Sequence, residues 1–397
     1  MDESFFRGRF AAKPIMKILV IGSDPRIFDT RTENFRRVRS YALVFEEFHI
    51  VSPAPVGTLP VRLGNFFLWP ISSRLPLVWW WRMVHRARHI ACQHRVDLVD
   101  AQDAGESGLA ALLIARALKI PFRIQLHTDV LSPYYRRASW KERMRYLLAR
   151  FLIPRASCLR VVSERIKTSL LQSEMVTDES RIVLLPIFTD VWAFLHASAD
   201  PAIEARLREY DFKMIAVGRF VDKEKNFSML IDVMRLFVRI CPRALLVIVG
   251  DGPDRVNYEL GMRKYGLEKN IIIEPWRNDL PSFYQSFDLF LGSSNYEGWG
   301  RAVIEAMAVG LAVVMTDTGL AGEFVKNQEN GMVVPVGDAR AFLEAIKILY
   351  QDTEKRKLLA AAGRETARNL TPATREEYLA HYRKSFELCF VSMRRPA

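Results

Sequence analysis

Short apolar runs that end in glycine are the feature that most restricts the fold of this 397-residue chain. The clearest are Lys17–Gly22, Lys213–Gly218 and Ala244–Gly250. A short apolar run without polar alternation is typical of a strand that is buried on both faces, as in a parallel sheet. The segments between these runs have the length and pattern of helices. The sequence therefore predicts an α/β fold in which right-handed crossovers connect parallel strands.

The apolar runs fall into two series, and the length of the chain also favours two domains over one. We expect an amino-terminal Rossmann-like domain over residues 1–190 and a carboxyl-terminal Rossmann-like domain over residues 191–371. Residues 372–397 are expected to form a final helix that packs back on the first domain. Pro186–Tyr210 is the best candidate for the linker.

The individual elements of both series follow from the same pattern. In the first series we expect strands at Phe48–Val51, Leu98–Ala101, Phe122–Leu126, Cys158–Val162 and Ile182–Leu185, and helices at Glu33–Phe45, Val78–His94, Glu106–Leu118, Trp140–Phe151 and Glu164–Gln172. In the second we expect further strands at Asn270–Ile273, Leu289–Leu291, Ala312–Met315 and Met332–Val334.

Positive charge is concentrated in the first half of the chain. The formal net charge is +12, and residues 1–200 hold 29 lysines and arginines against 19 acids, whereas residues 201–397 hold 28 against 26. A basic surface favours anionic partners such as phosphorylated acceptors, an anionic membrane or nucleic acid; a solvated arginine-rich surface is the alternative. Because the sequence has no nucleic-acid-binding signature, we expect no nucleic acid among the partners.

The segment Asn65–Arg88 combines aromatic residues with arginines. Phe66–Trp69 and Trp79–Trp81 lie among Arg74, Arg82, Arg86 and Arg88. This composition suits contact with a membrane interface, although a helix buried between domains or under a loop would also explain it. The sequence contains no run of about 18 uncharged apolar residues, so it predicts no membrane-spanning helix.

The four cysteines, Cys92, Cys158, Cys241 and Cys389, show neither a C-x-x-C pair nor a metal-ligand spacing with histidine. We expect four free thiols in a reducing compartment. The stretch Met1–Phe10 lacks the apolar centre of a signal peptide. The expected location is therefore the cytoplasm, or the inner face of the membrane if the basic half binds lipid.

The segment Asn295–Ala308 follows a predicted strand and carries two glycines and two glutamates. Gly298 and Gly300 allow the backbone to approach a ligand closely. A helix that begins near Gly300 would present free N–H groups and the positive end of its dipole, which together make an anion site. Glu297 lies just before this helix and Glu305 lies about two turns along it, and carboxylates accept hydrogen bonds from sugar hydroxyls. The alternative is an ordinary helix start with a dipole-compensating Glu297 and a solvent-facing Glu305.

Two cations follow the strand that ends at Gly218. Arg219 comes directly after this strand, and Lys225 is expected near the start of the next helix. In open α/β sheets, ligands bind beyond the carboxyl ends of the strands. The pair is therefore a candidate for holding a diphosphate, although cations at a strand end are more often simply solvated.

The segment Glu297–Ala308 contains in full the pattern E-G-x-G-x-x-x-x-E-A-M-A. It resembles the hallmark of the group 1 (family 4) retaining glycosyltransferases. The resemblance covers most of residues 213–350 and implies the GT-B fold, in which two Rossmann-like domains with parallel sheets face each other across a cleft. Other similar segments are Val217–Phe220, Lys225–Asn226, Gly250–Pro253, Thr316–Glu323 and Asn330–Pro335.

The resemblance also implies a role for each candidate residue. Arg219 and Lys225 would neutralise the donor diphosphate, Glu297 would contact the donor sugar near its reacting carbon, and Glu305 would bind the ribose hydroxyls. Backbone N–H groups over Gly298, Trp299, Gly300 and Arg301 would contact sugar or phosphate. His127 resembles the family histidine that faces the donor sugar across the cleft.

The chain departs from the family pattern in its first loop, Gly22–Glu33. This loop is usually glycine-rich, but here it lacks a Gly-Gly pair and contains Arg26 and Arg31, which are candidates to replace it. Arg301 also occupies a position where a small or apolar residue is common.

The function implied is retaining transfer of a hexose-type sugar from a nucleotide diphosphate sugar to a glycan, lipid-linked or other hydroxyl acceptor, in cell-surface polysaccharide or glycolipid biosynthesis. The donor is a substrate, so no cofactor is expected. No metal is expected either, because Arg219 and Lys225 supply positive charge and the sequence has no D-x-D motif. The alternatives are a GT-B-fold nucleotide-sugar epimerase, a phosphorylase, and a non-catalytic basic binding module.

Overall fold

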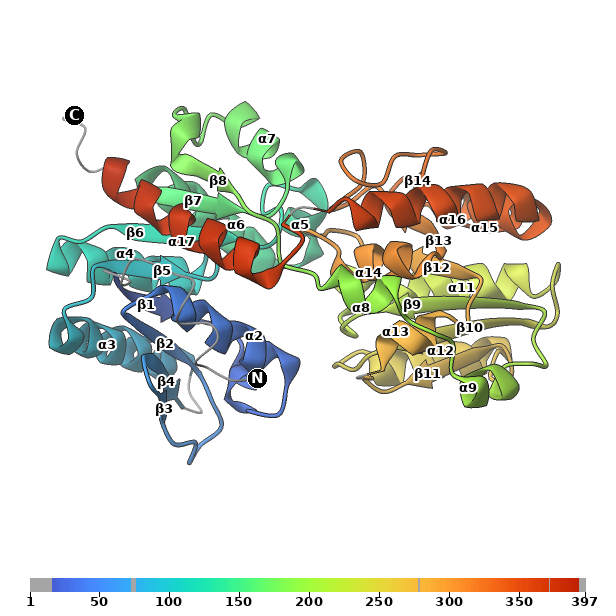
Figure 1. Ribbon diagram of the computed structural model, residues 1–397, viewed down its shortest axis with the longest axis horizontal. Helices are drawn as coiled ribbons and strands as arrows, with labels where there is room; N and C mark the ends of the chain where they lie inside the picture. Colours follow the sequence, from blue (N-terminus) through green and yellow to red (C-terminus); the bar gives the residue numbers. More distant parts are fainter. Residues whose placement is uncertain (1–15, 73–75, 278, 371, 393–397) are drawn as a thin grey trace. The chain divides into compact units, whose positions relative to one another are not determined.

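The computed structural model describes residues 16–72, 76–277, 279–370 and 372–392 (Figure 1). Met1–Phe10, where the sequence predicts no signal peptide, lies outside these residues. The chain divides into two compact units. The first contains the described residues up to Leu131, Ser139–Pro186 and the chain from Arg375; the second contains Ser132–Ala138 and Ile187–Thr374.

The first unit is built on an eight-stranded sheet with the order β3-β4-β2-β1-β5-β6-β7-β8. All neighbouring strands are parallel except β3 and β4, which form an antiparallel pair at one edge. The strands are β1 (Lys17–Ile21), β2 (Glu47–Pro53), β3 (Val61–Leu63), β4 (Phe66–Ile71), β5 (Leu98–Ala101), β6 (Phe122–Leu126), β7 (Cys158–Val161) and β8 (Ile182–Leu184).

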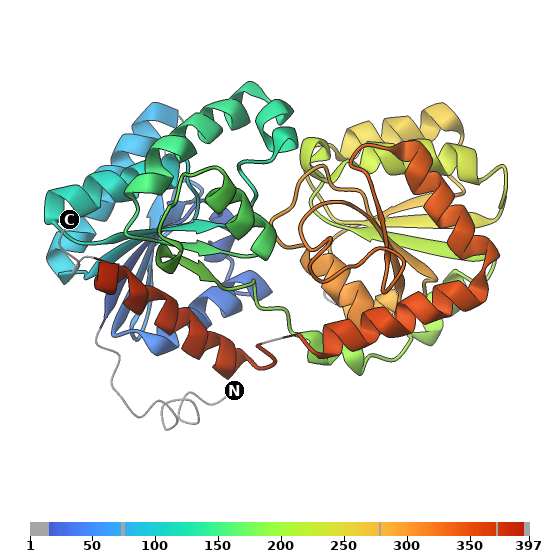
Figure 2. The ribbon, with the colours of Figure 1, turned by 90° about the horizontal axis from the view of Figure 1, so that it is seen from above.

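Helices cover both faces of this sheet (Figure 2). They are α2 (Glu33–Tyr41), α3 (Pro76–His94), α4 (Glu106–Leu118), α6 (Trp140–Leu152), α7 (Glu164–Gln172) and α17 (Arg375–Ser392). The predicted helix over Glu164–Gln172 is confirmed, and Ser163 caps it, since its hydroxyl accepts a hydrogen bond from the Ile166 N–H.

The second unit contains a six-stranded, fully parallel sheet with the order β11-β10-β9-β12-β13-β14. Its strands are β9 (Phe212–Val217), β10 (Ala244–Val249), β11 (Ile271–Glu274), β12 (Leu289–Gly292), β13 (Ala312–Thr316) and β14 (Met332–Val334). Its helices are α5 (Pro133–Ala138), α8 (Val191–Leu195), α9 (Pro201–Arg206), α10 (Asp222–Lys225), α11 (Phe227–Phe237), α12 (Arg255–Tyr265), α13 (Leu280–Tyr284), α14 (Arg301–Val309), α15 (Ala339–Gln351) and α16 (Thr353–Arg368).

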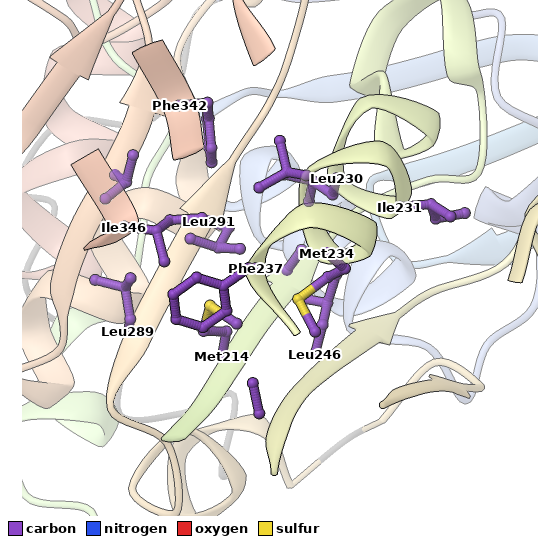
Figure 3. Close-up of a cluster of buried hydrophobic side chains, with 14 of the residues drawn as sticks. Met214, Leu230, Ile231, Met234, Phe237, Leu246, Leu289, Leu291, Phe342 and Ile346 are labelled. Carbon is purple, nitrogen blue, oxygen red and sulfur yellow. The ribbon is translucent and has the colours of Figure 1, made fainter. Parts of the chain in front are cut away.

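The hydrophobic core of the second unit holds its strands in position. Strands β9, β10 and β12 contribute fully buried aliphatic and methionine side chains, and α11 and α15 close over them (Figure 3). The side chains that meet there include Met214, Leu246, Leu289, Leu291, Met234, Phe237, Phe342 and Ile346. The close packing of these side chains holds the carboxyl ends of the strands in place. The loops that follow therefore start from fixed positions.

Several sequence predictions need correction. The helix expected over Glu33–Phe45 ends at Tyr41 and continues as a 3₁₀ turn. The linker candidate Pro186–Tyr210 contains two short helices, α8 and α9. Ser132–Ala138 belongs to the second unit, in which Tyr135 packs edge-to-face on Tyr296 with ring centroids 5.3 Å apart.

The aromatic segment Asn65–Arg88 is divided between strand β4 and helix α3. Phe66, Phe67 and Leu68 are buried in the sheet, and Trp81 is the aromatic side chain of α3 that is largely exposed. The segment thus offers less surface to a membrane than its composition suggested. Among the described helices, none is both long and apolar enough to cross a bilayer.

The expectation of four free thiols is wrong for two of them. Cys158 of β7 and Cys389 of α17 form a disulfide, with their Cα atoms 5.0 Å apart, whereas Cys92 and Cys241 are free. The two bonded residues are 231 positions apart in the sequence, so no local spacing could reveal the pair.

Candidate donor-binding site

The strand order of the second sheet indicates where a ligand is expected to bind. From β9 the chain adds β10 and β11 on one side, and later adds β12, β13 and β14 on the other. The strand order therefore reverses between β9 and β12. In open α/β sheets, ligands bind at the carboxyl side of such a switch point, because the loops from the two strands diverge there.

The loops from β9 and β12 bring two predicted site residues into contact at this point. The Lys225 ammonium, at the end of α10, donates a hydrogen bond to Glu297 Oε1, and both side chains are mostly buried. Ser294 Oγ donates to the same carboxylate oxygen at 3.0 Å. Burial lowers the pKa of Lys225, but the carboxylates of Glu297 and Glu224 outweigh it and raise that pKa above its ordinary value. Lys225 is therefore a fixed positive charge at the switch point.

Arg219 lies at the end of β9 but is held less tightly. Its guanidinium pairs with Glu224 at 2.8 Å, and its side chain is 54% exposed. Glu224 also approaches the Lys225 ammonium, at 3.5 Å. The two predicted cations thus share Glu224 as a partner, and an entering anion would compete with that carboxylate for both.

The backbone around this corner requires glycine. Gly300 has a φ of +98° and caps α14. Gly319, in the loop after β13, has a φ of +52°, and a Cβ there would lie 2.7 Å from the Trp299 carbonyl oxygen. A side chain at either position would strain the backbone or collide with it. Glycine at both positions allows the two loops to approach each other closely beside the start of α14.

The first turns of α14 place the remaining predicted residues. Arg301 and Glu305 form an i,i+4 ion pair at 3.2 Å, and the Glu305 side chain is almost completely buried. Glu305 is therefore not the solvent-facing residue of the alternative interpretation. The Trp299 indole is buried against Phe324, with ring centroids 5.1 Å apart. Trp299 can offer a ligand only its backbone, while its side chain anchors the loop; Gly298 is buried next to it.

His127 follows β6 in the first unit. Both of its ring nitrogens are buried and lack a hydrogen-bond partner among the described residues. Burial, followed by the charges of Arg160, Arg37 and Arg123, lowers the pKa of His127 to about 3. The imidazole is therefore neutral near pH 7. A buried polar ring without a hydrogen-bond partner lowers the stability of the fold. Such a ring is typical of a group that forms its hydrogen bonds with a ligand.

The loop Gly22–Glu33 is shaped by its own charges. Arg26 pairs with Asp24 at 2.9 Å and Arg31 with Asp29 at 3.0 Å, so each arginine folds back on the acid two residues earlier. Both arginines are mainly exposed. The candidates to replace the missing glycines are thus engaged locally.

Three polar residues near Lys225 and Glu297 were not predicted from the sequence pattern. Asn295 accepts a hydrogen bond from Asn226 through its side chain, at 3.1 Å, and its N–H donates to the Glu224 carbonyl at 2.8 Å. Ser294 and Glu224 hold Glu297 and the cations as described above. Their positions directly after β12 and beside Lys225 were the only signal available.

A second cluster of metal-ligand types lies at the amino end of β2. Glu47 Oε2 accepts from His49 Nε2 at 2.9 Å and from His94 Nδ1 at 2.8 Å. The Trp69 indole N–H donates to His49 Nδ1 at 3.2 Å, so His49 carries its proton on Nε2. A metal at Nε2 would move that proton onto Nδ1, against the indole N–H, and Lys17 already neutralises Glu47 at 2.9 Å. The residues of this cluster form a hydrogen-bond network whose donors and acceptors already pair with one another. The arrangement does not fit a metal ion.

The two units match two glycosyltransferase family models. Residues 202–366 match the model of "Glycosyl transferases group 1", and residues 40–187 match the "Glycosyl transferase 4-like domain". The chain belongs to the group 1 glycosyltransferases. The recognition from Glu297–Ala308 is thereby confirmed, and so is the predicted α/β fold of GT-B type.

Relatives and solved structures agree with this family. The chain is 34% identical over 154 residues to the lipopolysaccharide core biosynthesis glycosyltransferase LpsE of Rhizobium meliloti. This match covers 38% of this chain and 44% of that protein. It is 26% identical over 188 residues to the Escherichia coli UDP-Gal:alpha-D-GlcNAc-diphosphoundecaprenol alpha-1,3-galactosyltransferase, which covers 45% and 48%. The matches thus span less than half of each relative. The structure of Anabaena HepE in complex with UDP-glucose has a TM-score of 0.71 at 19% identity, and the match covers 95% of this chain and all of that one.

Proposed function

We propose that this group 1 glycosyltransferase moves a hexose-type sugar from a nucleotide diphosphate sugar to a hydroxyl group of a glycan or lipid-linked acceptor, with retention at the anomeric carbon and without a metal. The observation that carries the proposal is the contact between Lys225 and Glu297 at the switch point, beside the start of α14. A fixed cation, a carboxylate and free helix N–H groups in one corner suit a diphosphate joined to a sugar.

Charge development explains the residues. When the bond between the anomeric carbon and the phosphate oxygen breaks, negative charge grows on the leaving diphosphate and positive charge on the sugar. Lys225, Arg219 and the backbone N–H groups of α14 would stabilise the diphosphate as that charge grows. Glu297 would lie near the sugar, and Glu305 would accept hydrogen bonds from the ribose hydroxyls.

The comparisons support a sugar nucleotide as the donor and a polysaccharide or lipid-linked acceptor. HepE is described with UDP-glucose bound, and the Escherichia coli relative is named for a diphosphoundecaprenol acceptor. We include His127 in the proposal, as a neutral imidazole that would contact the donor sugar. We place the enzyme in cell-surface polysaccharide or glycolipid biosynthesis, at the cytoplasmic side of the membrane.

The proposal is tested by sugar transfer from a panel of UDP-, GDP- and ADP-sugars. We expect Glu297→Ala to lower the transfer rate by at least about 10³-fold, because it removes a group beside the reacting carbon. Lys223→Ala, on the same short helix as Lys225, serves as the control and should retain activity. Full turnover by Glu297→Ala would reject the assignment. Conversion of the donor in the absence of any acceptor would instead indicate an epimerase.

A further inference from the structure

Helix α6 carries an apolar stripe that the fold does not use. Trp140, Met144, Leu147 and Phe151 are 72%, 54%, 49% and 43% exposed. Their spacings of four, three and four residues place them on one side of the helix. Single exposed apolar residues are ordinary, but four in line on one helix form a patch that folding does not explain.

The opposite side of α6 already supplies the packing that the first unit needs. Its buried residues are Glu142, Ala149 and Leu152, and the helix packs on α4 through this side. The exposed stripe therefore points away from the body of the first unit. It is available to something outside that unit.

The charges beside the stripe are all positive. Arg143 and Arg150, seven residues apart, lie along one side of the stripe, and Lys141 lies along the other. All three are exposed, and within the described residues none of them pairs with a carboxylate. The one acid of the helix, Glu142, is buried and pairs with Arg145 at 3.6 Å.

We propose that α6 is a membrane-docking helix, which lies in the plane of an anionic bilayer surface with Trp140, Met144, Leu147 and Phe151 among the lipid chains. A narrow apolar stripe with arginine and lysine on both flanks matches a surface that is apolar inside and negatively charged at its headgroups. A protein partner would need a groove with carboxylates along both rims to satisfy the same charges, so the bilayer is the simpler match. This surface differs from Asn65–Arg88, whose composition suits either membrane contact or a buried helix.

The test is co-sedimentation of the full chain with vesicles, without donor or acceptor, so that its result is independent of the transfer reaction. One vesicle preparation contains phosphatidylcholine alone, and the other contains equal parts of phosphatidylcholine and phosphatidylglycerol. We expect binding to the anionic vesicles, weaker binding at high salt, and little binding to phosphatidylcholine alone.

Two double variants separate the apolar and charged contributions. Trp140→Ser with Phe151→Ser removes the ends of the stripe, and Arg143→Glu with Arg150→Glu reverses one flank. Each should weaken binding to anionic vesicles by about tenfold or more. The control is Trp192→Ser, which replaces a tryptophan of the second unit that is 69% exposed. It should bind like the wild type, and a thermal melt of every variant checks folding.

The proposal is overturned by equal binding of the stripe variant and the wild type, or by equal binding to both vesicle types. Self-association that the stripe variant abolishes, without any vesicle binding, would also overturn it and assign the stripe to contact between copies of the chain. If the stripe variant melts early, the charge-reversal variant decides, because its exposed arginines contribute nothing to the core.

Discussion

Buried charges in the first unit and in the second unit occupy different places relative to their sheets. In the first unit, Asp100, Arg123 and Arg160 lie within strands, and Arg160 donates to Tyr378 of α17 at 2.7 Å. In the second unit, Lys225 and Glu297 lie in the segments that follow β9 and β12. Charge alone therefore does not mark a ligand site. Charges inside the strands fasten a helix to the sheet, whereas we propose that those past the strand ends meet a ligand.

The largest effect is expected where the second unit depends on bare backbone. A Cβ on Gly250, just after β10, would lie 1.9 Å from the Gly218 carbonyl oxygen, and Gly250 has a φ of +153°. We expect Gly250→Ala to destabilise the protein by roughly 4 kcal/mol or to prevent folding, because backbone cannot move aside as a side chain can.

Urea unfolding measures this prediction against a matched glycine. Gly266 also has a positive φ, of +64°, but a Cβ there meets nothing within 4 Å. Gly266→Ala should cost only about 1 kcal/mol. Equal losses for the two variants would show that the tight approach of the loops after β9 and β10 is not what fixes the corner.

The next prediction concerns the free energy of unfolding of variants at two arginines that differ mainly in burial. Arg160 is 2% exposed and donates to Gln125, to Tyr378 and to the carbonyls of Leu185 and Pro186. Arg160→Met should destabilise the protein by about 3 kcal/mol, since it leaves several buried acceptors unpaired.

The half-exposed Arg219 is the control for this prediction. Its replacement by Met should change the free energy of unfolding by less than about 1 kcal/mol and should instead weaken diphosphate binding. Thermal melts of both variants decide the matter. A large loss of stability in Arg219→Met, with none in Arg160→Met, would reverse the distinction between the two units.

A smaller effect concerns His127 and pH. The pKa of this histidine is lowered to about 3 in the folded state, against an ordinary value of about 6.5. Between these values the unfolded chain binds a proton that the folded chain rejects, so stability falls as the pH drops below about 6.5. We expect His127→Gln to remove a loss on the order of 2 kcal/mol between pH 7 and pH 5. An unchanged slope of stability against pH in this variant would show that His127 titrates freely.

Much of the fold could be predicted because strands buried on both faces leave continuous apolar runs, as at Lys17–Ile21 and Ala244–Val249. The pair β3 and β4 was missed for a physical reason. Phe66 and Phe67 look the same in the sequence whether they face lipid or a neighbouring strand, and only the tertiary structure shows that they are buried.

The local sequence pattern predicted which residues lie near the site. It could not predict which residues from distant parts of the chain contact each other there. The spacing of Glu297 and Glu305 places both on the loop and helix that follow β12, and this needs only a few neighbouring residues. The contact of Lys225 with Glu297 joins positions 72 residues apart. The role of Glu224, between Arg219 and Lys225, depends on side-chain directions that no sequence pattern specifies.

We propose that a diphosphate binds where Lys225 meets Glu297, beside the start of α14. Calorimetric titration of wild type, Lys225→Ala and Lys223→Ala with UDP, and with GDP and ADP if UDP does not bind, tests it most directly. We predict that Lys225→Ala weakens binding by about 10- to 100-fold, because one charge-assisted contact is lost, and that Lys223→Ala binds like the wild type. Equal affinity of wild type and Lys225→Ala for the nucleoside diphosphate would show that Lys225 does not bind the diphosphate.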